Sequence, residues 1–599
     1  MTSSPETKLD ALPPALSSMW RLCKLGYRHE PRLMMATFVL SQLAALPDAL
    51  MALWLMLLGM GVIDHRPRLV LMAASGLGLS ATGTWFLRTV STRVQRRFRD
   101  RVTIALEAHV ARLQASVATI AHHEHPGHLD RLGMLRNQVF VLDHMYVSVF
   151  STCGFLLRLG VTVAFLVSIH PALLLLVVFA LPTVATSTLR PGIERAAELR
   201  AQQPHRLARH LFTLATTAAP GKEVRVTGIG ERLARERRAA WEFGFAPIAL
   251  ARWGSARWHA LAWAIFGAAY VAAVVFIAKV VGAPAAQVLL VLTAGARLSS
   301  YVGATVGEIG FLRGFWMEGA RKLAWLEDYA AALLADADRP VPARLAKGIR
   351  LEHVSFSYPG TSKLVLDDVS LSLPAGAVVA VVGENGAGKT TLVKLLAKMY
   401  EPTSGAVFLD DTPLARVRAD EWRSRLAGAF QDFFKFEFRA RHTVGLGDVP
   451  RLDDVPAVTA AVDRAGASDV LVNLKEGIET QLGPTWPGGA EVSFGQWQKL
   501  ALARGFMRDA PLLLILDEPT AALDAETEHA LFERYAAAAR DRSGHITLLV
   551  SHRFSTVRMA DRIVVLDGAR LVETGTHDEL MARKGQYAQL YGIQAAAYR

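Results

Sequence analysis

The sequence predicts an all-α region with six membrane-crossing helices, followed by an α/β domain built on a largely parallel sheet. Apolar residues make up 52% of the 599-residue chain, in long runs before about residue 315 and in short runs after it. From about residue 348, short β-branched runs alternate with helical stretches, which is typical of α/β domains. A glycine-rich loop follows one of those runs. A chain of this length also exceeds a single core, so at least two domains are expected.

Six apolar segments are each long enough, at about twenty residues, to cross a bilayer. The connections alternate between short ones and two long, charged loops near 88–136 and 190–257, which hold much of the excess behind the formal charge of +12. A basic chain can bind nucleic acid, but basic loops flanked by apolar segments favour a membrane protein with both loops and both termini in the cytoplasm. The predicted segments are 33–62, 69–90, 138–169, 171–190, 258–281 and 285–312.

Residues 1–330 are therefore predicted to form the transmembrane domain, 331–347 a linker and 348–599 the α/β domain. The N-terminus shows no cleavable signal peptide, and two distant cysteines support neither a disulfide framework nor a metal site. A helical spacing of apolar residues before the first segment predicts an amphipathic helix on the membrane surface, with an ordinary packed helix as the alternative. Its apolar positions are Leu16, Met19, Trp20 and Cys23.

A phosphate-binding loop is the strongest signal in the chain. A buried-strand run ends at Gly383, and the residues that follow match G-x-x-x-x-G-K-[ST] in a strand–loop–helix context. Backbone N–H groups of such a loop cradle phosphates at a helix N-terminus, while Lys389 reaches the β- and γ-phosphates and Thr390 binds Mg²⁺. The nucleotide-binding residues predicted here are Gly383, Glu384, Asn385, Gly386, Ala387, Gly388, Lys389, Thr390 and Thr391.

Further candidates for the same site follow in sequence order. A buried-strand run, 512–516, delivers Asp517 to Mg²⁺ and places Glu518 to polarise an attacking water. Tyr358 is placed to stack on adenine, although a core position is about equally expected for it. Gln431 is expected to contact Mg²⁺ and the water, and His552, at the end of another buried run, to donate to the γ-phosphate.

The segment 491–504 raises the question of whether its nucleotide-sensing signature still works, because Phe494 stands where such signatures usually carry a second glycine. The chemistry needs the hydroxyl of Ser493 and close backbone approach at Gly495, both at a helix N-terminus. A side chain at position 494 is tolerated if its φ is negative and the ring points away from phosphate. Gln496 and the following helix are present, so a working site is predicted.

Together these motifs resemble those of ATP-binding cassette (ABC) proteins, and the layout of the whole chain resembles an exporter-type half-transporter. Tyr358 resembles the A-loop, residues 383–391 Walker A, Gln431 the Q-loop and 492–496 the signature. Residues 512–518 resemble Walker B, Ala522-Leu523-Asp524 the D-loop and His552 the switch histidine, so Asp524 joins the predicted nucleotide-binding residues. The resemblance implies type I exporter-like helices that extend into the cytoplasm.

The resemblance also implies ATP and Mg²⁺ as ligands, and two paired chains whose cassettes hold each ATP between one Walker A and the other signature. The long loops would carry coupling helices near 118–128 and 208–220; solvated charged helices are the alternative. Intact Glu518 and His552 favour a homodimer over a heterodimer. The location implied is a membrane, most simply a bacterial plasma membrane, with the cassette cytoplasmic.

The expected function is ATP-driven export of an amphipathic small molecule, lipid or peptide. An exporter-fold importer, for example of metal–siderophore complexes, and an ATP-gated channel or regulator remain alternatives. A soluble cassette protein acting on nucleic acid is disfavoured by the six apolar segments, so no nucleic-acid partner is expected. Ionisable groups in a bilayer are costly, and they therefore mark either a substrate cavity or interhelical pairs. The candidate cavity residues are Asp48, Arg158, Arg297, Tyr301 and Glu308.

Overall fold

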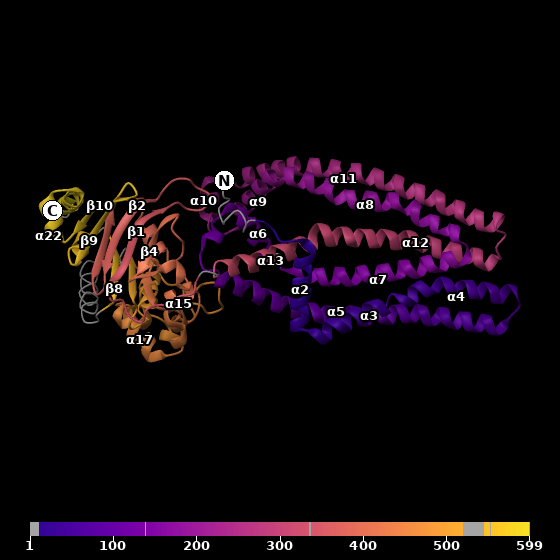
Figure 1. Ribbon diagram of the computed structural model, residues 1–599, viewed down its shortest axis with the longest axis horizontal. Helices are drawn as coiled ribbons and strands as arrows, with labels where there is room; N and C mark the ends of the chain where they lie inside the picture. The colour runs from indigo at the N-terminus through magenta and orange to yellow at the C-terminus, as the bar shows by residue number, and fades with distance from the viewer. Residues whose placement is uncertain (1–10, 138, 335–336, 519–543, 552, 598–599) are drawn as a thin grey trace. The chain divides into compact units, whose positions relative to one another are not determined.

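The computed structural model describes residues 11–137, 139–334, 337–518, 544–551 and 553–597 (Figure 1). The chain forms two compact units. The first comprises Met1–Arg112 with Gly133–Glu327, and the second comprises Leu113–Leu132 with Asp328–Arg599. The tip of the first long loop therefore belongs to the same unit as the α/β domain.

The described part of the first unit is helical, in agreement with the predicted all-α region. Short helical turns, η2 (Pro171–Leu174), η3 (Phe276–Val280) and η4 (Leu312–Trp316), join or extend the longer helices. The helices that lie or begin in this unit are α2 (Ala15–His29), α3 (Pro31–Leu43), α4 (Leu46–Ile63), α5 (Pro67–Ser116), α7 (Phe140–Ile169), α8 (Leu175–Arg200), α9 (Gln202–Thr216), α10 (Gly221–Thr227), α11 (Gly230–Val275), α12 (Ala285–Phe311) and α13 (Met317–Ala332).

Six helical runs are long and apolar enough to cross a membrane, which confirms the six predicted spans. Several are much longer than the apolar segments: the second reaches Ser116 and the fifth begins at Gly230. The added parts are rich in Arg and Glu, which are good helix formers and also pair at i,i+4, as Arg232 does with Glu236. Hydropathy detects only the part of a helix that lies in lipid. The extended helices agree with the exporter-like fold.

Two long helix pairs dominate the packing of this unit. Helix α8 lies along α11, and α12 lies along α7 (Figure 1). The apolar core between such helices includes Leu166, Phe266, Ile277 and Leu298, all at most 3% exposed. Helices are the form in which single segments satisfy all their backbone hydrogen bonds in lipid, so the apolar runs take this structure.

The N-terminal helix α2 has features of both predicted forms. Its stripe of Ser18, Leu22 and Gly26 is buried, and the Tyr146 hydroxyl of α7 donates to the Leu22 carbonyl (2.6 Å). Leu16 and Trp20 on another stripe are each 70% exposed. The helix thus packs on the bundle through Ser18, Leu22 and Gly26 and leaves an apolar stripe open, as a surface-lying helix requires.

The second unit contains the α/β domain, with two sheets. A four-stranded antiparallel sheet has the order β2-β1-β4-β5, and a six-stranded sheet has the order β10-β9-β3-β8-β7-β6. Neighbours in the larger sheet are parallel except for β10, which pairs antiparallel with β9. The strands are β1 (Gly348–Phe356), β2 (Leu366–Pro374), β3 (Val378–Gly383), β4 (Ser404–Leu409), β5 (Thr412–Pro413), β6 (Leu426–Ala429), β7 (Leu513–Asp517), β8 (Ile546–Val550), β9 (Arg562–Asp567) and β10 (Arg570–Gly575).

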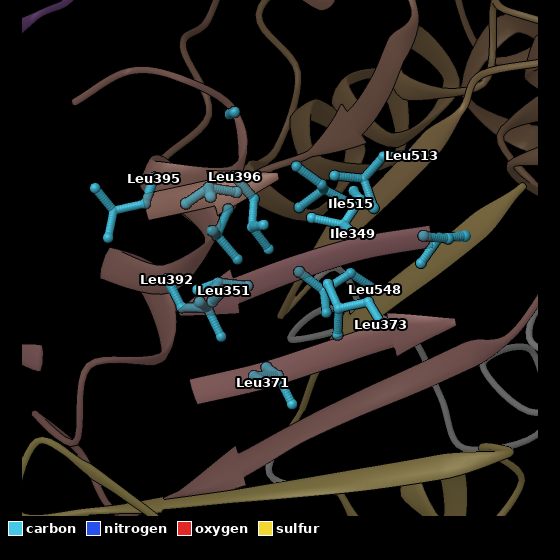
Figure 2. Close-up of a cluster of buried hydrophobic side chains, with 14 of the residues drawn as sticks. Ile349, Leu351, Leu371, Leu373, Leu392, Leu395, Leu396, Leu513, Ile515 and Leu548 are labelled. Carbon is cyan, nitrogen blue, oxygen red and sulfur yellow. The ribbon is translucent and has the colours of Figure 1, made fainter. Parts of the chain in front are cut away.

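The helices of this unit are short. The one that follows β3, α14, packs its leucines between the two sheets. Figure 2 shows these leucines meeting Leu351 and Leu371 of the antiparallel sheet and Ile515 of the parallel one. The described helices are η1 (Ala121–His123), α6 (Pro126–Asn137), α14 (Lys389–Leu396), η5 (Leu414–Arg416), α15 (Ala419–Ser424), α16 (Ala440–Gly445), η6 (Leu446–Arg451), α17 (Val455–Arg464), α18 (Ser468–Val472), η7 (Gly477–Glu479), α19 (Phe494–Gly505), α21 (Phe554–Val557), α22 (His577–Arg583) and α23 (Gln586–Ala597).

Candidate nucleotide-binding site

The phosphate loop runs from the end of β3 to the start of α14, as the motif predicts. Gly386 and Gly388 have φ of +87° and +101°, a region that side chains rarely adopt. A Cβ at Gly388 would also lie 2.7 Å from the Val365 carbonyl oxygen. The buried Lys389 ammonium donates to the carbonyls of Gly383 (2.8 Å) and Glu384 (3.0 Å). The loop therefore has the tight turn that a phosphate cradle needs, with the lysine inside it.

Asp517 lies at the C-terminal end of β7, which is separated from β3 in the sheet by β8. It is 1% exposed, and neither carboxylate oxygen accepts a well-aligned hydrogen bond from the described residues. Burial raises the pKa of Asp517 to about 6, and Glu518 and Asp432 add to the rise; Thr390 and Lys389 oppose it. A buried acceptor without a donor, close to Thr390, suits a hard cation. These residues therefore fit Mg²⁺.

Glu518 follows directly and has a left-handed backbone conformation, with φ of +47°. Its amide donates to the Val550 carbonyl (3.0 Å), which ties the turn to the end of β8. Gln431 Nε2 donates to Glu518 Oε2 (2.9 Å). Non-glycine residues in this region cost of order 1–3 kcal/mol and cluster at functional sites. The structure thus brings together Gln431 and the predicted catalytic carboxylate.

Tyr358 lies beside the helix that follows the phosphate loop. Its hydroxyl shares a hydrogen bond with the Thr391 hydroxyl (3.0 Å), and its ring packs edge-on against Tyr400, with centroids 5.4 Å apart. The Lys394 ammonium lies 5.5 Å from the ring centroid. The ring is partly buried. Its position is consistent with either predicted role, adenine stacking or packing.

Ser493 caps the N-terminus of α19. Its hydroxyl accepts from the Gln496 amide (3.3 Å), while the Gln496 side chain accepts from the Ser493 amide (2.8 Å). This capping box follows the Ser-x-x-Gln spacing, a readable signal that the motif-based prediction left unused. Phe494 is the first residue of α19 and is not among the described non-glycine residues with positive φ. The predicted backbone geometry at position 494 is present.

Two predicted site residues, Asp524 and His552, lie outside the described residues, and their roles stay predictions. The sequence-based analysis also missed the residues of the α/β domain that receive the first long loop. The Ile120 amide donates to the Met399 carbonyl (2.9 Å), and the Tyr400 hydroxyl donates to the Glu124 carboxylate. Arg423 donates to the Ala118 carbonyl. The tip of the loop, predicted as a coupling segment at 118–128, is thus fastened to the α/β domain.

The second predicted coupling segment, 208–220, does not form one continuous helix. Helix α9 ends at Thr216, and a turn leads to α10 at Gly221. The α10 C-cap, Gly228, has φ of +67°, so the loop is divided by glycine- and proline-containing turns. Which part of it docks on an α/β domain stays a prediction.

Three of the five candidate cavity residues meet between α4 and α12. Arg297 donates to the Asp48 carboxylate (2.5 Å) and to its backbone carbonyl (2.7 Å), and the Tyr301 hydroxyl donates to the other carboxylate oxygen (2.7 Å). Arg158 lies over the Phe155 ring of its own helix, and Glu308 is half-buried on α12. Among the described residues, no ion pair joins either of these to the cluster. The contacts favour interhelical pairing for Asp48, Arg297 and Tyr301.

This pairing predicts coupled stabilities. Arg297→Gln leaves the Asp48 carboxylate without its charged partner and is expected to cost roughly 1–3 kcal/mol. Asp48→Asn should cost a similar amount, and the double variant should lose less than the sum because both singles remove the same interaction. Thermal unfolding in one detergent measures all four proteins. Strictly additive losses would contradict the pairing.

Because the Asp517 carboxylate is buried, we predict that it makes the free energy of unfolding depend on pH. Its raised pKa means that the charged carboxylate weakens the fold above about pH 6, an effect that fades as the pH falls towards the ordinary value near 4. Asp517→Asn should therefore stabilise the nucleotide-free protein by up to about 3 kcal/mol at pH 7.5 and by roughly half of that at pH 5. Unfolding of both proteins across this range, without Mg²⁺, measures the difference. A pH-independent difference would contradict the burial of a charge here.

Comparison with known proteins agrees with this geometry. Residues 366–521 match the ABC transporter family. An ATP-dependent lipid A-core flippase of Ralstonia nicotianae is 42% identical over 250 residues, which is 41% of each chain. YgaD of Bacillus subtilis, provisionally named a multidrug export ATP-binding/permease protein, is 38% identical over 247 residues, also 41% of each chain. The match thus spans less than half the length of these curated relatives.

A solved structure of a bacterial Atm1-family ABC exporter with ATP bound is similar along nearly the whole chain. It covers 94% of this chain and 100% of its own, with a TM-score of 0.75 and 22% identity. At that identity the likeness concerns the fold. With the ABC transporter domain in its C-terminal half and six helices able to span a membrane before it, the chain has the fold and domain order of an ABC exporter-type half-transporter.

Proposed function

We propose that this chain is an ATP-driven exporter that works as a pair of copies. The observation that carries the proposal is that one chain joins six potential membrane spans to a domain in which the phosphate loop, Asp517, Glu518 and Gln431 gather at the C-terminal edge of a parallel sheet. A soluble nucleic-acid-binding cassette has no use for the spans. An ATP-gated channel would show conductance uncoupled from turnover.

The chemistry assigned to the site follows from its contacts. Lys389, inside the loop, would exchange its two carbonyl partners for the β- and γ-phosphates of ATP. Thr390, Gln431 and Asp517 would hold Mg²⁺, which neutralises charge on the phosphates when bound. Glu518 would accept a proton from the attacking water, and the Gln431 amide keeps that carboxylate oriented. His552 would donate to the γ-phosphate.

A second copy would complete each site. Ser493 stands at the positive N-terminal end of α19, where its hydroxyl and the helix dipole favour an anion presented by a partner cassette. Because Glu518 and His552 are both present in this sequence, two identical sites explain the residues more simply than a pair with one degenerate site. A heterodimer with a second gene product is the alternative.

Transport would follow from movement of the cassettes. The loop tip at 118–124 is bonded to the α/β domain through Met399, Tyr400 and Arg423, so displacement of that domain pulls on the helices α5 and α6 that flank the tip. ATP binding that favours paired cassettes would then shift the spans towards an outward-open state, and hydrolysis would release them.

Export of an amphipathic molecule is proposed over import. The fold is that of an exporter, and the relatives' names describe lipid flipping and multidrug export. The cytoplasmic side would hold the cassette, and a bacterial plasma membrane is the proposed location. Because Asp48, Arg297 and Tyr301 bind one another, they give little support for a charged substrate site. Transport direction in proteoliposomes, with the cassettes outside, distinguishes an exporter from an importer.

Glu518→Gln tests the hydrolytic role. It keeps the shape and the Gln431 contact but removes the base, so ATP turnover should fall by roughly 10²–10⁴-fold while nucleotide binding persists. Turnover and binding of the full chain are measured in the same nanodiscs. The matched control is Glu476→Gln, which changes an exposed glutamate of the same domain. Unchanged turnover in Glu518→Gln would remove Glu518 from the role.

A further inference from the structure

The segment that follows Gln431 is unusually aromatic and lies along the signature helix α19. This aromatic segment, residues 433–438, reads Phe-Phe-Lys-Phe-Glu-Phe. At the N-terminus of α19, the ring centroids of Phe433 and Phe494 are 5.4 Å apart, within the range of attractive aromatic pairs. The Lys435 ammonium lies 5.6 Å from the Phe494 centroid, which adds a cation–π contact. Phe494, which replaces the usual glycine of the signature, therefore has contact partners within its own chain.

The same segment also holds the other end of the helix. The Arg504 guanidinium carbon lies 4.9 Å from the Phe436 centroid, and the guanidinium reaches the Phe434 carbonyl (3.4 Å). Phe436 in turn lies edge-on to Phe434, with centroids 5.0 Å apart. The aromatic segment is thus attached to the first residue and to the last turn of α19.

Burial separates the two rings of the N-terminal contact. Phe433 is partly buried against the core cluster that includes Trp497 and Leu500 of α19. Phe494 is 60% exposed, so its ring contributes little to that core. Burial in the core therefore does not explain why a phenylalanine stands at position 494, where glycine is usual. Its described contacts are with Phe433 and Lys435, on the side of the residues that follow Gln431.

The contact joins two points of nucleotide chemistry. Gln431, two residues before Phe433, bonds Glu518 of the chain's own site. Ser493, the residue before Phe494, is the hydroxyl offered to the partner's ATP in the proposed dimer. We propose that the Phe433–Phe494 contact is a positioning element that makes the signature hydroxyl follow Gln431, and so couples the two ATP sites. This inference rests on the proposed function.

The physical argument concerns freedom at the N-terminus of α19. With glycine at position 494, the capping box and the Trp497 amide bond to the Ser493 carbonyl (2.9 Å) would still hold Ser493, but the ring contact would be lost and glycine would loosen the first turn. The ring extends the first turn onto the aromatic segment. In the proposal, Phe433 moves with Gln431 when Gln431 turns towards nucleotide and water. The Phe494 ring, which packs at a tilt against Phe433, then carries the first turn of α19 along.

Leucine substitutions test the proposal, because they keep bulk and helix propensity but remove the ring. ATP hydrolysis by the full chain in nanodiscs gives kcat, KM and the Hill coefficient. Phe494→Leu and Phe433→Leu are each expected to raise KM for ATP roughly two- to tenfold and to lower the Hill coefficient towards one, with kcat changed less. The double variant should resemble either single variant, since one contact is lost in all three. Phe494→Tyr, which keeps the ring, should retain wild-type values.

Phe438→Leu is the matched control. It removes a ring from the same segment, but this ring stacks on Phe436 rather than on Phe494, so KM and cooperativity should stay at wild-type values. Unchanged KM and Hill coefficient in Phe494→Leu, additive effects in the double variant, or an equal effect of Phe438→Leu would each overturn the proposal. So would a Phe494→Gly variant that hydrolyses ATP orders of magnitude faster than wild type.

The wild type and Glu518→Gln, measured in the same assay, distinguish a failure of this inference from a failure of the proposed hydrolytic function on which it rests. A wild type without turnover, or Glu518→Gln with full turnover, would refute the proposed hydrolytic function and this inference with it. If turnover is normal and depends on Glu518, but KM and the Hill coefficient are unchanged in Phe433→Leu and Phe494→Leu, only the coupling is refuted.

Discussion

Burial of β3 between β8 and β9 is the constraint on which the nucleotide site depends. Residues 378–382 are buried on both faces, with α14 and the antiparallel sheet on one side and an apolar cluster that includes α17 and α19 on the other. A strand held in this way cannot shift its register without exposing apolar side chains. The loop leaves β3 at Gly383, and the carboxylates leave β7 on the far side of β8. Both are therefore delivered to the same edge of the sheet with fixed spacing.

That rigid edge supports groups that are unfavourable in isolation. Asp517 is buried with a raised pKa, Glu518 has a left-handed backbone, and Lys389 is buried with a pKa lowered by desolvation. Each would relax if the surrounding packing were loose. In the proposed function, each would face a ligand of opposite charge or a reacting water. The strained and buried groups are thus the residues to which the proposed function assigns roles, and the apolar core on either side holds them in place.

The membrane region also has to compensate a charged group that water does not solvate, and it does so with side chains of a neighbouring helix. In lipid there is no water to solvate Asp48, so Arg297 and Tyr301 take that place across the α4–α12 contact. In the other unit, the loop tip at 118–124 is held to the α/β domain by a backbone amide, a carboxylate and a carbonyl, beside the apolar packing of Ile120 and Ala121. Polar joints of this kind can be directional, which is what transmission of a movement requires.

The sequence by itself determined the fold class, the six spans and the identity of the nucleotide-binding loop, because apolar run length and glycine spacing are local properties of the chain. Hydropathy alone did not give the ends of the helices, because it marks only the part in lipid, whereas backbone hydrogen bonding continues into water; the extension was expected from the family resemblance. Only the tertiary structure decided that Asp48, Arg297 and Tyr301 bind one another, and that the Phe494 ring packs at a tilt against Phe433. Those contacts join residues about 60 to 250 positions apart, so no local pattern could reveal them. The features that the sequence revealed are local along the chain, whereas the contacts that only the fold revealed join residues far apart in the sequence.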